Sequence, residues 1–209
     1  AKLMPPRAEE LLKEIYNLAD RDMSRYLETG DDDFSVSVKG LSRFRINAYK
    51  QRGTLAAVIR VVSFDIPDYS SLNIPEDIIK ECAGSTKGLI LVTGPAGGGK
   101  STTLACIIDE INKNRNGHII TLEDPIEYLH KNKKSLISQR EINSDTDNYI
   151  TALRASLRQS PDVILLGEMR DYETISVAMT AAETGQLVLS TLHTLGAAST
   201  IDRIIDVFP

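Results

Sequence analysis

Residues 94–101 read GPAGGGKS and fit the pattern G-x-x-x-x-G-K-[ST], which sits between a strand and a helix wherever it functions. Here the apolar run LILV precedes it, and helical spacing follows from Lys100 to about Asn114. Gly94 and Gly99 permit a tight loop whose backbone N–H groups surround a phosphate, and a helix start favours an anion. A plain glycine-rich turn does not require this setting. The motif therefore predicts a phosphate-binding loop in an α/β fold.

Within the motif, we expect Lys100 to reach the β- and γ-phosphates of a nucleotide and the Ser101 hydroxyl to bind magnesium. The motif does not separate ATP from GTP. A guanine-reading N-K-x-D pattern is missing, since NKKS at 132–135 lacks the aspartate, and there is no L-S-G-G-Q segment of transporter ATPases. ATP with Mg²⁺ is therefore the expected ligand. The residues expected to contact it are Gly94, Pro95, Ala96, Gly97, Gly98, Gly99, Lys100, Ser101 and Thr102.

Strand and helix patterns alternate after the motif. Short apolar strands are predicted at 88–94, 118–124, 135–142, 162–169 and 186–192. Helices are predicted at 148–159, 171–184 and 196–208, with a short helical stretch after residue 124. Such alternation favours a mostly parallel sheet with helices on both faces.

The first 65 residues have a different pattern. Apolar residues at helical spacing predict one helix over 8–29, which Gly30 ends. Period-two alternation then predicts a hairpin that turns at 39–40, followed by a third strand near 55–62. Residues 63–75 lack periodicity. We expect a partial α+β domain at 1–65, a linker at 66–75 and the P-loop domain at 76–209.

Composition excludes several classes of protein. The 209 residues are 42% hydrophobic and 25% charged, as in soluble globular proteins, and no apolar run is long enough to span a bilayer. The net charge of −5 argues against a nucleic-acid surface. Cys82 and Cys106 lack metal-binding spacing and are interpreted as buried thiols in a reducing cytoplasm.

Carboxylates gather at the end of a second predicted strand, in ITLEDPIEYLH at 120–130. Glu123, Asp124 and Glu127 would lie at the edge where open α/β sheets bind ligands. One of them could polarise the attacking water as a general base. Glu123 or Asp124 could instead cap the following turn, where Pro125 is suited to a helix start. Glu127 is therefore the favoured catalytic candidate.

His193 ends another predicted strand, in STLHT at 190–194. A lone histidine is usually a packed or surface residue, and we interpret His118 and His130 in that way. His193 differs because its strand belongs to the same sheet, whose carboxyl edge should open near the phosphates. It is therefore a candidate site residue.

A last apolar strand in PDVILLGEMRD, at 161–171, ends at Gly167, where an aspartate that holds magnesium is usual. Together with GPAGGGKSTT, TLEDPIEYLH and STLHT, this segment resembles the Walker B, Walker A, Asp-box and His-box motifs of the secretion-ATPase superfamily. The sequences of these motifs are most similar to those of the branch that retracts type IV pili in twitching motility. The resemblance extends over nearly the whole chain.

The resemblance implies a RecA-like P-loop ATPase domain behind a PAS-like amino-terminal domain. Walker B ends in Gly-Glu in this family, so Gly167 is no defect. Glu168 is then expected to hold the magnesium shell and Glu127 to activate water, although the two roles could be exchanged. Arg45 and Arg60 resemble arginines that the amino-terminal domain offers to the phosphates. The alternation of Arg43, Arg45 and Asn47 is equally typical of a solvent-facing strand.

The resemblance also implies an ATP-driven motor for pilus retraction. It would form a homo-hexamer on an inner-membrane pilus platform protein, at the cytoplasmic face, without inserting into the membrane. The alternatives are a related secretion or pilus-extension motor, a nucleotide sensor that does not hydrolyse ATP, and a DNA-pairing RecA-like protein. A sensor would be expected to lack Lys100, Ser101 or Glu168, and all three are present.

Three departures from the family pattern stand out. Gln186 occupies a position where retraction ATPases usually have a histidine, which predicts a site less sensitive to pH. The chain is expected to start inside the amino-terminal domain and to stop before a carboxy-terminal helical region. Its two cysteines cannot form the four-cysteine zinc site that is common in the pilus-extension branch.

Overall fold

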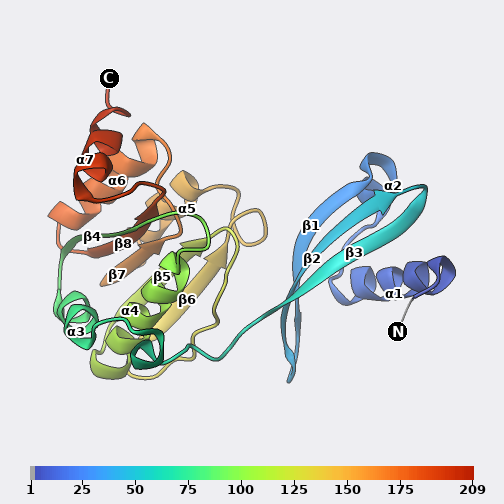
Figure 1. The fold of residues 1–209 in the computed structure, drawn as a ribbon, viewed down its shortest axis with the longest axis horizontal. Helices are drawn as coiled ribbons and strands as arrows, with labels where there is room; N and C mark the ends of the chain where they lie inside the picture. Colours follow the sequence, from blue (N-terminus) through green and yellow to red (C-terminus); the bar gives the residue numbers. More distant parts are fainter. Residues whose placement is uncertain (1–2) are drawn as a thin grey trace. The chain divides into compact units, whose positions relative to one another are not determined.

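The computed structural model of the chain describes residues 3–209. These residues form two compact units, and the boundary between the units lies between Ser63 and Phe64 (Figure 1). Each unit has a hydrophobic core of its own.

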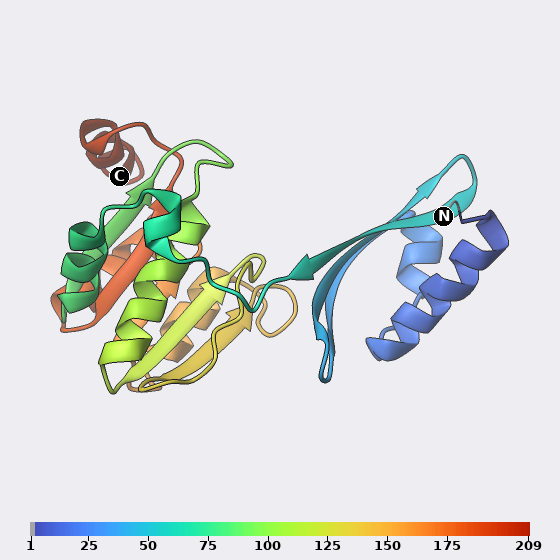
Figure 2. The same ribbon diagram turned by 60° about the horizontal axis from the view of Figure 1, so that its bottom comes forward.

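The first unit packs two helices on one face of an antiparallel sheet, as Figure 2 shows. Phe34 lies opposite Ile46 across the first strand pair, and both side chains are buried beneath Tyr16 and Tyr26. The predicted hairpin and third strand are confirmed. The elements are α1 (Pro5–Leu18), α2 (Ser24–Thr29), β1 (Asp31–Val38), β2 (Ser42–Gln51) and β3 (Thr54–Val62), in the sheet order β1-β2-β3.

The single helix predicted over 8–29 is wrong. The chain leaves the helical conformation after Leu18, and Asp20 has a φ of 48°. Both α1 and α2 bury their apolar side chains in the same core, so helical spacing continues through the break. The break also lets the Arg21 guanidinium donate to both carboxylate oxygens of Asp32, at 2.8 and 2.7 Å.

The second unit is an α/β domain, and the predicted parallel sheet is confirmed. All of its strand pairs are parallel, in the order β4-β8-β7-β5-β6. Its elements are the 3₁₀ helix η1 (Tyr69–Leu72), α3 (Glu76–Gly84), β4 (Gly88–Thr93), α4 (Lys100–Asn114), β5 (His118–Glu123), β6 (Leu136–Glu141), α5 (Tyr149–Ser156), β7 (Val163–Leu166), α6 (Tyr172–Glu183), β8 (Leu187–Leu192) and α7 (Ala197–Ile205).

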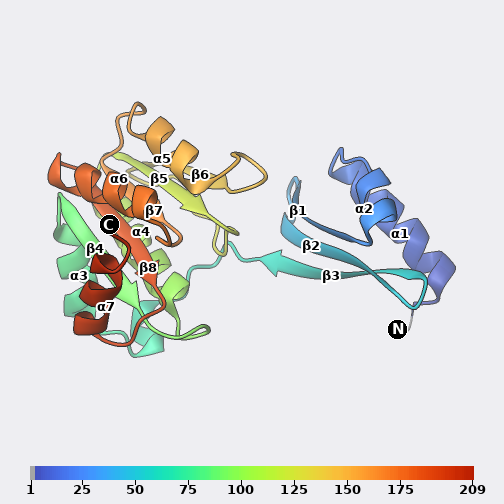
Figure 3. The same ribbon diagram turned by 90° about the horizontal axis from the view of Figure 1, so that it is seen from above.

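Both faces of this sheet are buried, which is why its strands have continuous apolar runs. Ile119 and Leu165 face the core formed with α3 and α4, whereas Ile120 and Leu166 face α5 and α6. Figures 2 and 3 show these helix pairs on opposite faces. Because the strands are parallel, the carboxyl ends of β4, β5, β7 and β8 meet at one edge of the sheet.

Two segments differ from simple expectation. Residues 124–130, predicted to include a short helix, form a loop that begins with a cis Asp124–Pro125 peptide. The predicted linker 66–75 contains η1, and it packs Ile66, Tyr69 and Ile74 against the core of the second unit. Among residues 3–209, no helix has the length and apolar character needed to cross a bilayer.

Candidate active site

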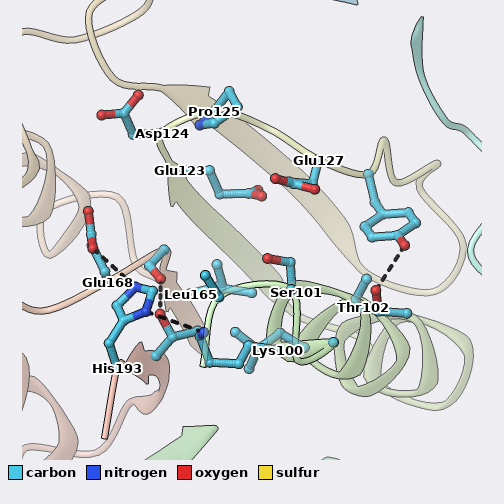
Figure 4. A pocket seen from close by; sticks show the side chains of 18 of the residues that line it. Lys100, Ser101, Thr102, Glu123, Asp124, Pro125, Glu127, Leu165, Glu168 and His193 are labelled. Carbon is cyan, nitrogen blue, oxygen red and sulfur yellow. Dashed lines mark hydrogen bonds and ion pairs between the residues drawn. The ribbon is translucent and has the colours of Figure 1, made fainter. Parts of the chain in front are cut away.

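The GPAGGGKS segment connects β4 to α4 at the carboxyl edge of the sheet. Gly99 has a φ of 82°, a conformation that favours glycine, and α4 begins at the next residue. A cavity of about 440 Å³ opens at this turn, a size typical of small-molecule sites. Ser101 and Thr102 line it from α4, and residues that follow β5, β7 and β8 line it from the other side (Figure 4).

Lys100 is held over its own loop at the base of this cavity. Its ammonium group donates to the carbonyl oxygens of Gly94 at 2.9 Å and Pro95 at 2.8 Å, and the residue is only 9% exposed. The Nδ1 atom of His193 lies 3.5 Å away. An ammonium group can only donate, so Nδ1 accepts and Nε2 carries the proton of a neutral ring. That Nε2 atom lies 3.9 Å from Oε2 of Glu168, beyond hydrogen-bond distance, so the ring lies between the lysine and the carboxylate.

Gly167 at the end of β7 has a steric explanation. A Cβ atom at this position would lie 2.8 Å from the hydroxyl oxygen of Tyr149 and 3.4 Å from Cα of Glu123. The Gly167 carbonyl accepts a hydrogen bond from the Thr191 hydroxyl at 2.6 Å, which ties β7 to β8. The close approach of β5 and Tyr149 therefore leaves no room here for an aspartate.

Glu168 follows directly and is the carboxylate that this strand supplies to the cavity. Its side chain is 15% exposed, and Oε2 accepts from Nε of Arg170 at 2.7 Å. This hydrogen bond raises the pKa of Arg170 above its usual value. Arg170 thus partly neutralises Glu168 from the solvent side.

A second pair of carboxylates comes from β5 and the loop after it. Figure 4 shows Glu123 and Glu127 pointing toward one another near Ser101, while Asp124 points away. Glu123 accepts from the Thr121 hydroxyl at 2.5 Å and from Nε2 of Gln139 at 3.3 Å. Burial raises the pKa of Glu123 to about 7, against the hydrogen bonds that lower it. No helix follows at 124–130, but the backbone N–H of Glu127 donates to the Glu123 carboxylate, so Glu123 does cap the turn after β5.

The structure brings most of the expected site residues to this one cavity. Gly94 and Pro95 lie at the loop and bond to Lys100, and a Cβ at Gly98 would approach the Pro95 carbonyl to 3.0 Å. The expected residues that line the cavity are Ala96, Gly97, Gly99, Lys100, Ser101, Thr102, Glu127, Glu168 and His193.

Arg45 and Arg60 belong to the first unit. They lie opposite one another on β2 and β3, and Arg45 forms an ion pair with Asp33 at 2.8 Å. Their part in nucleotide chemistry remains a prediction. Gln186 precedes β8, whereas His193 follows it, so about 20 Å of strand separates them. Gln186 therefore makes no contact with His193 within one chain. Across the described residues, the structure shows no direct contact through which Gln186 would change the pH sensitivity of the cavity.

Several residues at the cavity escaped sequence reasoning. Tyr128, Tyr149 and Arg170 line it, and Gln139 bonds to Glu123 at its rim. Arg170 could have been noticed two residues after Glu168. For the two tyrosines no local signal exists, because their partners lie on distant segments.

The oxygen donors at the cavity fit a magnesium ion. The Ser101 hydroxyl and the Glu168 carboxylate line the same space, and Mg²⁺ usually takes one or two protein ligands together with phosphate and water oxygens. Within residues 3–209 there is no group of three or more His, Cys, Asp or Glu that would hold a metal by itself. The donor set therefore suits an ion held jointly with phosphates.

Residues 8–207 match the family model described as "Type II/IV secretion system protein". The chain is 48% identical to the "Type IV pilus retractation ATPase PilT" of Pseudomonas aeruginosa, over 99% of this chain and 60% of that protein. It is 50% identical to the "Twitching motility protein" of Neisseria gonorrhoeae, over 91% of this chain and 50% of that one. The chain thus spans about half to three fifths of the length of these relatives.

Solved structures agree with the sequence matches. A crystal structure of the pilus retraction motor PilT with bound ADP matches with a TM-score of 0.88 and 49% identity, over 96% of this chain and 59% of that one. The Legionella pneumophila ATPase DotB matches with a TM-score of 0.81 and 34% identity, over 97% of this chain and 58% of that one.

Proposed function

Since the chain belongs to the type II/IV secretion system protein family, we propose that its second unit is a RecA-like domain that hydrolyses ATP to power the retraction of type IV pili. One observation carries the proposal. A P-loop lysine, a hydroxyl suited to magnesium, two carboxylates and a histidine from separate strands converge on one cavity. A domain that only bound nucleotide would not need the carboxylates opposite the phosphate loop.

In this proposal Lys100 leaves the Gly94 and Pro95 carbonyls to bind the β- and γ-phosphates. Ser101 and Glu168 would hold magnesium, which would supply positive charge at the phosphates when ATP is bound. Glu127 orients a water molecule and accepts its proton, a role usually worth about 10²–10⁴-fold in rate. His193 lies between Lys100 and Glu168 and so stands close to both groups that act at the phosphates.

The finer assignments rest on the resemblance of the sequence motifs to the family. The first unit is PAS-like, and its Arg45 and Arg60 stabilise charge at the phosphates of a nucleotide site. The protein acts as a homo-hexamer at the cytoplasmic face of the inner membrane, on a pilus platform protein. The 48% identity to a protein named as a retraction ATPase supports the proposed role in pilus retraction.

ATP hydrolysis is tested with three variants. Lys100→Ala should abolish phosphate release and weaken nucleotide binding, because the phosphates lose their main cation. Glu127→Gln and Glu168→Gln should keep binding of a fluorescent ATP analogue while turnover falls about 100-fold or more. Lys113→Ala and Glu183→Gln are matched controls on α4 and α6, outside the cavity, and should behave as the parent. Parent-like phosphate release by Lys100→Ala would refute the proposal.

The cellular role has a separate test. Deleting the gene in its own organism should abolish twitching while surface pili remain. Loss of the pili themselves would identify an extension motor, and loss of protein secretion with normal twitching would identify a secretion ATPase.

A further inference from the structure

One hydrogen bond connects the P-loop helix to the loop that carries Glu127. The Thr102 hydroxyl lies 3.0 Å from the hydroxyl of Tyr128, and the dashed line at Thr102 in Figure 4 marks this bond. Thr102 directly follows Ser101 on α4, and Tyr128 directly follows Glu127. The bond thus joins the neighbours of two residues that the proposed reaction uses.

The other side of the same loop is fastened to β6. The Nε2 atom of Gln139 donates to the Tyr128 carbonyl at 2.9 Å, and the Ile126 N–H donates to Oε2 of Glu141 at 3.1 Å. Glu127 therefore lies between two backbone anchors, one on each side. These anchors fix the loop to the sheet, but they do not set its distance from α4. The Tyr128 phenol spans this gap at the start of α4, next to Ser101, whereas Asn112 near the end of α4 holds Lys131, beyond the loop.

We propose that Tyr128 is a positioning residue, whose hydrogen bond to Thr102 fixes the Glu127 carboxylate relative to Ser101 and the bound phosphates. This inference rests on the proposed ATP hydrolysis at the cavity. A general base works only within hydrogen-bond reach of the water that it activates, and small displacements cost rate. The bond also connects the loop directly to the helix that begins at the phosphate-binding loop.

A double-mutant cycle tests the bond. Tyr128→Phe removes one hydroxyl and keeps the ring, and Thr102→Val removes the partner hydroxyl at nearly constant volume. Each should lower kcat about three- to tenfold, the range for one lost hydrogen bond, and Tyr128→Phe should change KM for Mg·ATP less than about twofold. The double variant should be no slower than either single one, and Thr102→Ser, which keeps a hydroxyl, should recover most of the parent kcat.

Tyr172→Phe is the matched control, since it removes a tyrosine hydroxyl on α6 outside the cavity and should leave kcat unchanged. Parent-like kcat in Tyr128→Phe, or effects of the two substitutions that multiply, would overturn the inference.

A measurement without turnover separates this inference from the proposed function. Hydrogen–deuterium exchange of residues 124–130 should slow when the parent binds a non-hydrolysable ATP analogue with Mg²⁺, and slow much less in Tyr128→Phe. If the parent binds the analogue but never hydrolyses ATP, the proposed function is wrong while the exchange data still decide about the bond. Equal protection in parent and variant would overturn the bond's role and leave hydrolysis standing.

Discussion

At the scale of single residues, Gly167 is a position where neighbouring atoms leave room only for glycine. The hydroxyl of Tyr149 and the backbone of Glu123 occupy the space that any side chain would need. We expect Gly167→Ala to lower the free energy of unfolding by about 1–3 kcal/mol, the usual cost of forcing extra atoms into a packed region. Denaturant unfolding of parent and variant measures this difference.

Two further variants check the cause. Tyr149→Phe combined with Gly167→Ala should recover part of the loss, because the nearest obstructing atom is gone. Gly84→Ala in α3 is the control, since no atom lies within 4 Å of its added Cβ, and it should be neutral or slightly stabilising. An equal loss in both glycine variants would show that crowding is not the reason.

Glu123 makes a residue-scale prediction about pH. Its pKa is about 7 in the folded chain, against the ordinary value of 4.5. Between these two pH values the folded state keeps a proton that the unfolded state releases, so this group lowers stability progressively as pH rises through the window. Glu123→Gln mimics the protonated acid and should remove that trend.

The check is denaturant unfolding at several pH values from about 4.5 to 7.5. The stability of Glu123→Gln relative to the parent should grow as pH rises. Glu81→Gln, which changes an exposed carboxylate on α3, should give a difference that stays constant. A constant difference for Glu123→Gln as well would contradict the assignment of a buried, proton-holding carboxylate.

At the scale of elements, sequence patterns predicted what local spacing determines. The helix from Lys100 to Asn114 and the apolar strands of the second unit were identified because their periodicity is continuous. The break between α1 and α2 was missed because both helices face one core. The loop at 124–130 was missed because its conformation depends on Gln139 and Glu141, whose side chains hold it from a different strand. Such cross-strand anchoring leaves no signal in the loop's own sequence.

The candidate site divides in the same way. The P-loop residues were identified from their own spacing, and Glu127, Glu168 and His193 from their places after predicted strands. Tyr128 and Tyr149 could not be identified, because their roles depend on which residues the fold places opposite their hydroxyls. Prediction from sequence thus found the residues that reach the cavity through their place after a strand, and missed those that reach it through packing.

At the scale of the whole molecule, the two separate cores make the units energetically distinct. The first unit depends on Asp32, whose side chain is 4% exposed and accepts from Arg21 and from the Tyr16 hydroxyl. Burial alone would raise the pKa of Asp32, but these hydrogen bonds lower it overall. Asp32→Ala should therefore destabilise the first unit by about 1–3 kcal/mol, the cost of leaving buried polar groups unpaired.

The same variant should leave the second unit intact. The affinity for a fluorescent ATP analogue should stay within about twofold of the parent value. Unfolding of the first unit, monitored by hydrogen exchange of the amides of residues 31–62, should begin at a lower denaturant concentration than in the parent. Asp33→Ala, at the next position on β1 but 44% exposed in its side chain, is the control and should have a small effect. Parallel loss of both units in Asp32→Ala would show that they unfold as one.

The strand order of the second unit also has a consequence for how the protein is made. In the described part of the chain, β4 pairs with β8 and with no other strand, yet β4 is the first strand of its sheet to be synthesised and β8 the last. A ribosome adds about 5–20 residues per second, so β4 waits several seconds for its partner. The nucleotide loop that follows β4 gains its support only when residues 187–192 insert between two strands already made. A nascent chain therefore cannot complete the support of its nucleotide-binding loop until β8 has been made, however early the motif itself leaves the ribosome.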